Sequence, residues 1–231
     1  MNDVKWERYG AAAGVIFVIL VVVGALIGGA PPSPDDSIGK IGDYYADHTG
    51  AIKAGAFLSG LAMVAFLWFL GSLWSTLRRS EDTRRLATIA TGGGIVGLIL
   101  AVTGFAVNAA VALAVDQGRQ SVQLVNPKFI YLLSTAIGGM SNFGLAVLVA
   151  AVGVAALRTR VFPAALAWAS LVIALGWIVG GLVLVTDASA IFAVGFIVFL
   201  VWLIWVLVIS FFLFRPHEEA ALATPAAPST P

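Results

Sequence analysis

Long apolar runs alternate with short polar connections along the chain. Six runs reach the roughly 20 residues that a helix needs to cross a bilayer, at 11–30, 54–77, 86–115, 128–157, 162–185 and 190–214. Since backbone groups inside lipid must hydrogen-bond within their own segment, runs of this kind form helices. The pattern predicts an all-α fold, a polytopic membrane bundle of six transmembrane helices that makes one domain over residues 1–215.

The connection between the second and third runs is basic. It carries arginines, which are costly to place in lipid, at Arg78, Arg79, Arg84 and Arg85. Because cytoplasmic loops carry an excess of Lys and Arg, we expect this turn in the cytoplasm. An even number of spans then puts both termini on that same side. Of the 13 Lys and Arg residues, few fall on the opposite side: Lys40, Lys53, Arg119 and Lys128.

The arginines of this turn have a second interpretation. Basic side chains near a membrane surface attract anionic lipid headgroups by about 1 kcal/mol per charge. A role as a topology anchor is sufficient to explain them, so a specific headgroup site stays an alternative.

The polar connection 31–53 has the pattern of a short amphipathic helix at about 34–48. Ser33 can cap its start, Pro34 suits its first position and Gly50 can end it. We expect this helix to lie on the outer membrane surface or to cap the bundle. One of its faces gathers residues at helical spacing, namely Ile38, Ile41, Tyr45 and His48.

This outer helix also brings acids, a base and an aromatic ring together, at Asp43, Tyr45, Asp47 and His48. A carboxylate–histidine pair can serve a hydrolase, but no nucleophile motif such as G-x-S-x-G accompanies it. A metal site needs more ligands at defined spacing. An interfacial helix anchored by tyrosines explains the same residues, because aromatic rings favour that depth. An outer-surface enzyme is therefore the least favoured hypothesis.

Within the apolar runs, a loose set of polar side chains lies on the third and fourth spans: Asn108, Tyr131, Ser134, Ser141 and Asn142. We expect segment 138–142 near the bilayer centre, where polar residues are unusual. The functional interpretation is a cavity lining that hydrogen-bonds a small ligand. The structural interpretation is hydrogen bonding between helices, which is common in bundles and contributes about 0.6 kcal/mol on average.

The sixth span is rich in bulky aromatic residues and contains a single glycine, Gly195. Such a helix favours contact with lipid or a partner over close packing inside the bundle. It is therefore the expected surface for a membrane protein partner or for a homo-oligomer. Its aromatic residues are Phe192, Phe196, Phe199, Trp202, Trp205, Phe211, Phe212 and Phe214.

Composition narrows the chemistry. The chain has no cysteine, which excludes disulfides, thiolate metal sites, iron–sulfur clusters and a cysteine nucleophile. Its net charge of +1 provides no basic surface for nucleic acid, and we expect no cofactor, no metal and no catalytic residue. No span holds an acid, a base or a histidine between its ends, which argues against proton-coupled transport. The segment 216–231, rich in Ala, Pro and Thr, predicts a disordered cytoplasmic tail.

Two short motifs carry a resemblance. They are Ile41-Gly42-Asp43-Tyr44-Tyr45-Ala46-Asp47-His48 and, in the next span, Phe69-Leu70-Gly71-Ser72-Leu73 before the basic turn. In these motifs the chain resembles a family of uncharacterised actinobacterial integral membrane proteins with six helices. The resemblance implies a protein of the bacterial plasma membrane. It covers the spans but not the tail, and it implies no assigned activity.

Two functional hypotheses follow from these patterns. The first is a non-enzymatic accessory or scaffold component of the plasma membrane that acts through its sixth helix. The alternative is a binder or transporter of a small apolar or amphipathic ligand, in a cavity lined by the third and fourth helices. They differ in whether the polar residues of those two helices face a cavity or bond to one another.

Overall fold

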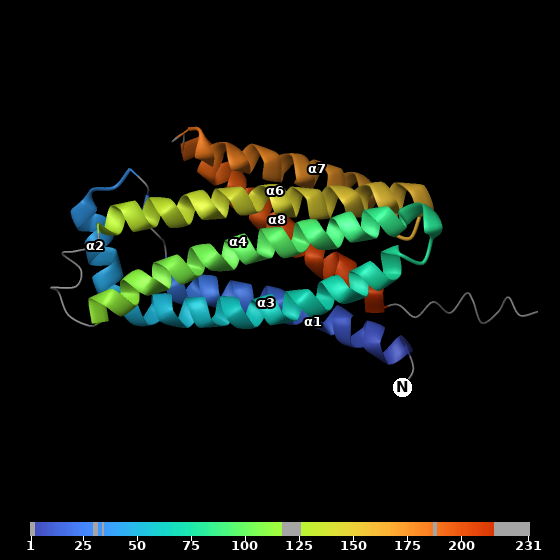
Figure 1. The fold of residues 1–231 in the computed structure, drawn as a ribbon, viewed down its shortest axis with the longest axis horizontal. Helices are drawn as coiled ribbons and strands as arrows, with labels where there is room; N and C mark the ends of the chain where they lie inside the picture. Colours follow the sequence, from blue (N-terminus) through green and yellow to red (C-terminus); the bar gives the residue numbers. More distant parts are fainter. Residues whose placement is uncertain (1–2, 30–31, 34, 117–125, 187–188, 215–231) are drawn as a thin grey trace, which may run out of the picture.

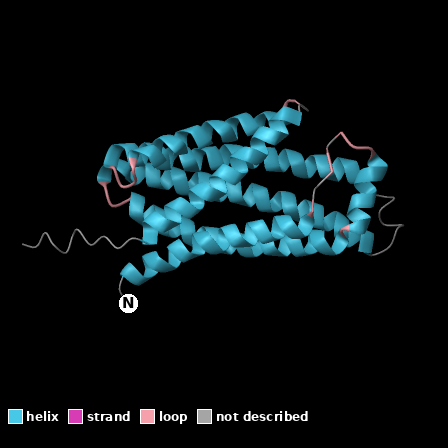
Figure 2. Ribbon diagram, turned by 180° about the vertical axis from the view of Figure 1, so that it is seen from behind, coloured by secondary structure: helices cyan, strands magenta, loops and turns pink. Residues whose placement is uncertain are grey.

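The computed structural model describes residues 3–29, 32–33, 35–116, 126–186 and 189–214. Every regular element in these ranges is helical, as Figure 2 shows. Six of the helices are long and apolar enough to cross a membrane. The predicted all-α, six-span architecture is thereby confirmed, while the predicted tail, 216–231, lies outside the described residues.

The helices follow one another with short connections. In chain order they are α1 (Asp3–Gly28), α2 (Ile38–Asp47), α3 (Thr49–Leu77), η1 (Glu81–Thr83), α4 (Arg84–Asp116), α6 (Pro127–Thr159), α7 (Ala164–Gly180), η2 (Gly181–Leu184) and α8 (Ser189–Phe214). All are α-helices except η1 and η2, which are 3-10 helices.

The six spanning helices form a closed ring. Going round the bundle, α1 contacts α3, α3 contacts α4, α4 contacts α6, α6 contacts α7, α7 contacts α8, and α8 returns to α1. The spans run up and down along the long axis (Figure 1). The arginine-bearing turns between α3 and α4 and between α6 and α7 lie at one end, here called the arginine end. Helix α2 lies across the other end, here called the α2 end (Figure 1).

Helices α4 and α6 pack closely because their contact is made by glycines. A Cβ built on Gly144 would lie 2.5 Å from the backbone nitrogen of Gly97, and one on Gly93 would lie 2.8 Å from the carbonyl oxygen of Gly144. A residue with a Cβ atom does not fit at either position unless the helices move apart. Small residues at such spacing are typical of membrane helices whose backbones touch.

Helix α8 runs diagonally across the ring (Figure 1). Near the α2 end it packs on α7, where a Cβ on Gly180 would lie 3.5 Å from the Cα of Gly195. Near the arginine end it packs on α1, where a Cβ on Gly14 would lie 2.1 Å from Ser210 Oγ. Helix α8 therefore separates from α1 toward the α2 end.

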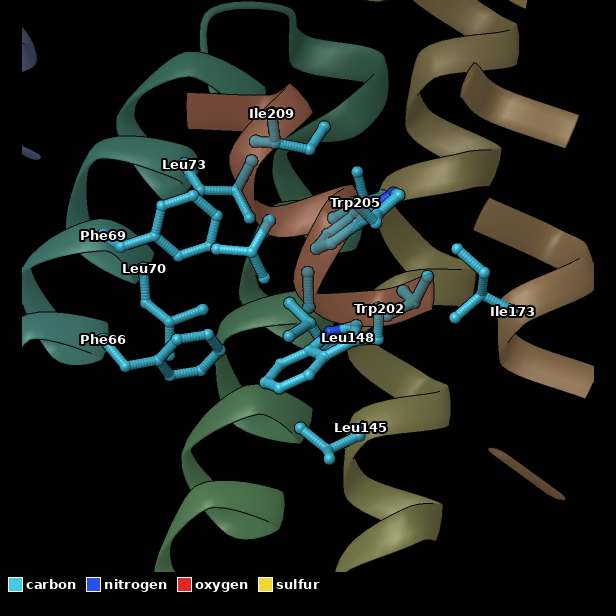
Figure 3. Packing of buried hydrophobic residues seen from close by; sticks show 14 of the residues in the cluster. Phe66, Phe69, Leu70, Leu73, Leu145, Leu148, Ile173, Trp202, Trp205 and Ile209 are labelled. Carbon is cyan, nitrogen blue, oxygen red and sulfur yellow. The ribbon is translucent and has the colours of Figure 1, made fainter. Parts of the chain in front are cut away.

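The main core fills the middle and the arginine half of the ring. Large side chains from α3, α6, α7 and α8 converge there (Figure 3). The Trp202 ring lies 5.6 Å from Phe17 and 5.7 Å from Phe66, centroid to centroid. Trp205 donates its indole N–H to Ser170 Oγ at 2.8 Å.

The burial of Trp202 and Trp205 corrects the expectation for the sixth span. Both side chains are buried, although the aromatic helix was expected to face lipid or a partner. The physical reason is the diagonal path of α8, which turns one of its faces into the ring. The opposite face keeps the expected exposure, with Phe196, Ile204 and Phe211 open on the surface.

Two boundaries near α2 also differ from expectation. The helix begins at Ile38 rather than near residue 34, and Ser37 rather than Ser33 caps it by accepting a hydrogen bond from the Lys40 backbone N–H at 3.3 Å. Pro34 lies outside the described residues. Gly50 does not end a helix, because α3 already begins at Thr49. The chain turns at His48 and enters the span at once.

Candidate functional site

A polar cluster lies where α2 crosses the ends of α4 and α6. Ile41 and Tyr45 are the buried residues of α2, and they pack with Val111 of α4 and against Ile130 and Tyr131 of α6. The amphipathic pattern placed these two on one face with Ile38 and His48, but Ile38 is exposed and His48 is half-buried. Helix α2 is therefore a cap on the bundle, which decides between the two placements that the sequence left open.

Asn108 is the centre of this cluster. The Tyr45 hydroxyl donates a short hydrogen bond to Asn108 Oδ1. Ser134 Oγ lies 3.2 Å from the same oxygen and 2.7 Å from the Tyr131 carbonyl, and its single proton can serve either acceptor. Side chains from α2, α4 and α6 thus meet at one amide oxygen. We call Tyr45, Asn108, Tyr131 and Ser134 the cap cluster.

Three further hydrogen bonds hold the connection between α1 and α2. The Tyr131 hydroxyl donates to the Pro32 carbonyl at 2.5 Å, and the Tyr44 hydroxyl donates to the Gly28 carbonyl at 3.2 Å. Lys128 Nζ donates to the Asp36 carbonyl at 3.1 Å. These bonds fasten α2 and its leading segment to α1 and α6.

Electrostatics keep the tyrosines of α2 neutral. Burial raises the pKa of Tyr45 well above its ordinary value of 10.0, and the neighbouring Tyr131 and Tyr44 add to this effect. Burial also raises the pKa of Tyr44. Both hydroxyls are therefore donors at any ordinary pH. On the exposed rim, the hydrogen bond from Lys40 lowers the pKa of Asp36, with a second bond from the Ser33 N–H.

Helix length places the cap cluster near the edge of the hydrocarbon. Helices α4 and α6 have 33 residues each and are about 50 Å long at 1.5 Å per residue, whereas the hydrocarbon core is about 30 Å thick. Asn108 lies about 36 Å along α4 from Arg84. Because Arg84 must stay outside the hydrocarbon, Asn108 lies near the opposite boundary, where water and headgroups begin.

The same reasoning revises the expected depth of segment 138–142. Asn142 lies about 24 Å along α6 from Arg158, closer to the α2-end boundary than to the bilayer centre. The sequence-based expectation took the middle of the fourth span to be the middle of the membrane. The middle of α6 lies off the bilayer centre because α6 extends beyond the hydrocarbon at the α2 end.

The five residues predicted to line a ligand cavity fall into three environments. Asn108, Tyr131 and Ser134 belong to the cap cluster. Ser141 donates to the Gly138 carbonyl of its own helix at 2.6 Å. Asn142 points toward α7 and α8, where a Cβ on Gly180 would lie 3.2 Å from its Nδ2. The Asn142 amide is half-buried and has no hydrogen-bond partner among the described residues.

The residues of the predicted outer-surface site do not form a catalytic constellation. Asp43 and Asp47 are exposed, while the His48 ring stacks on Tyr44 at 4.7 Å and its Nδ1 lies 3.0 Å from the Tyr44 carbonyl. Tyr45 points into the cap cluster instead. Within the described ranges, no group of three or more His, Asp or Glu residues could hold a metal ion.

The four arginines of the predicted headgroup site lie exposed at the arginine end. The Arg78 guanidinium lies over the Trp74 ring, 4.2 Å from its centroid. Arg84 forms an exposed ion pair with Glu81 at 3.1 Å.

Three buried polar groups were not singled out from the sequence. The indole N–H groups of Trp177 and Trp202 and the hydroxyl of Ser210 have no hydrogen-bond partner among the described residues. The two indole rings meet edge to face with their centroids 5.8 Å apart, a geometry that is favourable in itself. No local pattern identifies these groups, because an apolar span can turn any of its faces inward.

Comparison of the chain with models of known protein families, with curated proteins and with solved structures finds no match. A function must therefore be inferred from the arrangement of the residues alone. That arrangement fastens helices to one another and does not bring a nucleophile, a general base or a set of metal ligands together among the described residues.

Proposed function

We propose that this chain is a non-enzymatic component of the bacterial plasma membrane that acts by binding the transmembrane helix of a partner protein. The binding surface is made by the facing sides of α1 and α8 toward the α2 end, where the two helices have separated. The same proposal places the arginine end in the cytoplasm, as the excess of basic residues favours.

The observation that carries this proposal is a difference in burial along single helices. No residue of α1 is buried over 19–28, none of α3 over 49–61, and none of α8 over 190–201. On the same helices, Phe17, Phe66 and Trp202 are buried nearer the arginine end. Near the α2 end, the side chains of α1 and α8 that point into the ring therefore stay accessible to a partner helix.

A helix suits this surface better than a soluble domain does. The uncovered segments 19–28 and 190–201 contain no polar side chain, so their partner must be apolar. Phe192, Gly195 and Phe199 stand three and four residues apart on the face of α8 that carries Trp202, none of them is buried, and this spacing forms a packing ridge. A helix about 10 Å wide can pack on two diverging helices at once.

Photocrosslinking tests this proposal directly. A photoreactive residue at Phe199, three residues before the buried Trp202, or at Val22, four residues after the buried Val18, should form the same adduct with a membrane protein in native membranes. Phe196, on the outer face of α8, and Val172 of α7 are the controls, since they are 62% and 67% exposed. A protein adduct at the controls as well, or at no position, would count against a specific partner.

The orientation has its own test, which the absence of cysteine makes simple. In intact cells, a membrane-impermeant maleimide should label Asp47→Cys and should label Asp82→Cys only after lysis. The reverse pattern would overturn the placement of the arginine end.

Asn142 favours a second candidate function, the binding of a small amphipathic molecule. Its half-buried amide, without a partner among the described residues, lies beside Gly180 and Gly195 at the contact of α6, α7 and α8. A polar group on an apolar ligand could pair with it. Native mass spectrometry of the purified protein should then show a bound small molecule that Asn142→Leu loses, and that Asp43→Asn retains.

A further inference from the structure

We propose that the arginine end binds the phosphate headgroup of an anionic glycerophospholipid, in a site built from both arginine-bearing turns. This site is separate from the partner surface of α1 and α8. It extends the arginine set predicted from one turn by adding Arg158 and Arg160 of the turn between α6 and α7.

Close packing of α4 and α6 brings the two turns together. Helix α4 begins at Arg84 and α6 ends at Thr159, and the glycine contact holds the two helix ends side by side. Helix η1 contacts the end of α6. Thr83 of η1 is buried, and its hydroxyl donates to the Leu77 carbonyl at 2.6 Å. This bond closes the first turn on the end of α3.

The charges at this end are only partly neutralised. Glu81 pairs with Arg84, but Arg85, Arg158 and Arg160 form no ion pair within the part of the chain that the structure describes, and all three are exposed. Guanidinium groups bind phosphate through two parallel hydrogen bonds. Several such groups on two adjoining turns therefore provide a complementary surface for one phosphate.

The backbone of Arg160 ends α6 in a conformation that favours glycine. Its φ of 54° lies in the left-handed region, and its N–H bonds to the Ala156 carbonyl at 2.8 Å to end α6. Glycine usually occupies this position at a helix end, because it adopts the conformation without strain. An arginine here keeps a charged side chain beside Arg158 at a backbone cost that glycine would avoid.

The surroundings favour a lipid over a soluble phosphate. Exposed apolar side chains stand next to the arginines, among them Trp74 under Arg78 and Leu157 beside Arg158. Tryptophan is enriched at the membrane–water boundary, so these guanidinium groups lie at headgroup depth. A phosphate bound there has its acyl chains along the exposed faces of the helices.

The test compares lipids on the purified full-length protein in a zwitterionic detergent. Phosphatidylglycerol should raise the melting temperature by several degrees more than phosphatidylcholine with the same chains. The variant R85Q/R158Q/R160Q should lose most of this difference. Lys40→Gln, which removes one charge at the α2 end, should keep it. An equal response to the two lipids, or an unchanged response in the triple variant, would overturn the site.

Arg160→Gly keeps the proposal testable if the triple variant does not fold. Glycine relieves the left-handed backbone, so the lipid-free melting temperature should stay the same or rise. The affinity for phosphatidylglycerol, measured by native mass spectrometry, should fall several-fold. Unchanged affinity would contradict the site. A shift produced equally by millimolar glycerol phosphate without lipid would show that the ligand is a soluble phosphate, and would overturn the assignment to lipid.

Discussion

The two halves of this bundle share the same apolar spans but pack differently. In the arginine half, glycines bring α4 and α6 into contact and aromatic rings from four helices interlock around Trp202. In the α2 half, α8 has separated from α1, and the cap cluster holds the helix ends with hydrogen bonds. Apolar composition therefore fixes that a segment enters the membrane, while glycine positions and helix crossing fix how tightly it packs there.

The largest expected effect is the loss of a ring from the arginine half. Trp202→Ala should lower the free energy of unfolding by about 3 kcal/mol, because it leaves a cavity that the surrounding rings cannot fill. Phe196→Ala, on the exposed face of the same helix, should change stability by less than about 0.5 kcal/mol. Denaturant unfolding in mixed micelles measures both. Equal effects would show that the two halves of α8 do not differ.

A smaller effect is expected from the glycine contact. Gly144→Ala should lower the free energy of unfolding by about 2 kcal/mol, since its Cβ would overlap backbone atoms of α4. Gly138→Ala on the same helix is the control, because nothing lies within 4 Å of its Cβ. Thermal unfolding compares the two variants. A Gly138→Ala variant that is as unstable as Gly144→Ala would refute this explanation.

The cap cluster should respond more weakly and more locally. Tyr45→Phe removes the donor to Asn108 and should cost about 1 kcal/mol. Hydrogen exchange should increase in α2 and stay unchanged around Trp202, because the residues buried under α2 and those around Trp202 form separate clusters. Asp43→Asn, at an exposed position of the same helix, should leave exchange unaffected. Faster exchange in the arginine half would show that the cap stabilises the whole bundle.

The smallest effect is a dependence on alkaline pH. The pKa of Tyr45 is higher in the folded protein than the ordinary value of 10.0, so its contribution to stability is complete below that value. The contribution should fall as pH rises above about 10, because the unfolded tyrosine ionises first. The protection factor of α2, which excludes the intrinsic rise of exchange with pH, should therefore fall between about pH 9 and pH 11. Tyr45→Phe should remove most of this fall, and an equal fall in the variant would contradict the assignment.

The six spans and the arginine end could be predicted from the sequence because their signals are local. About 20 apolar residues in succession must form a helix in lipid, and arginines must stay outside the hydrocarbon. The inward positions of Ile41 and Tyr45 on α2 were also predictable. One side of that helix meets water, so polar residues lie on that side and apolar residues on the other.

The partners of those elements could not be predicted in the same way. Tyr45 meets Asn108 across 63 positions of sequence, and the acceptor for Tyr131 is a backbone carbonyl that no sequence pattern marks. The spans are apolar on every side, so their periodicity does not say which face points inward. Tertiary packing turned Trp202 into the core and Phe196 outward. It did so because close contact at Gly14 and at Gly180 set the diagonal path of α8.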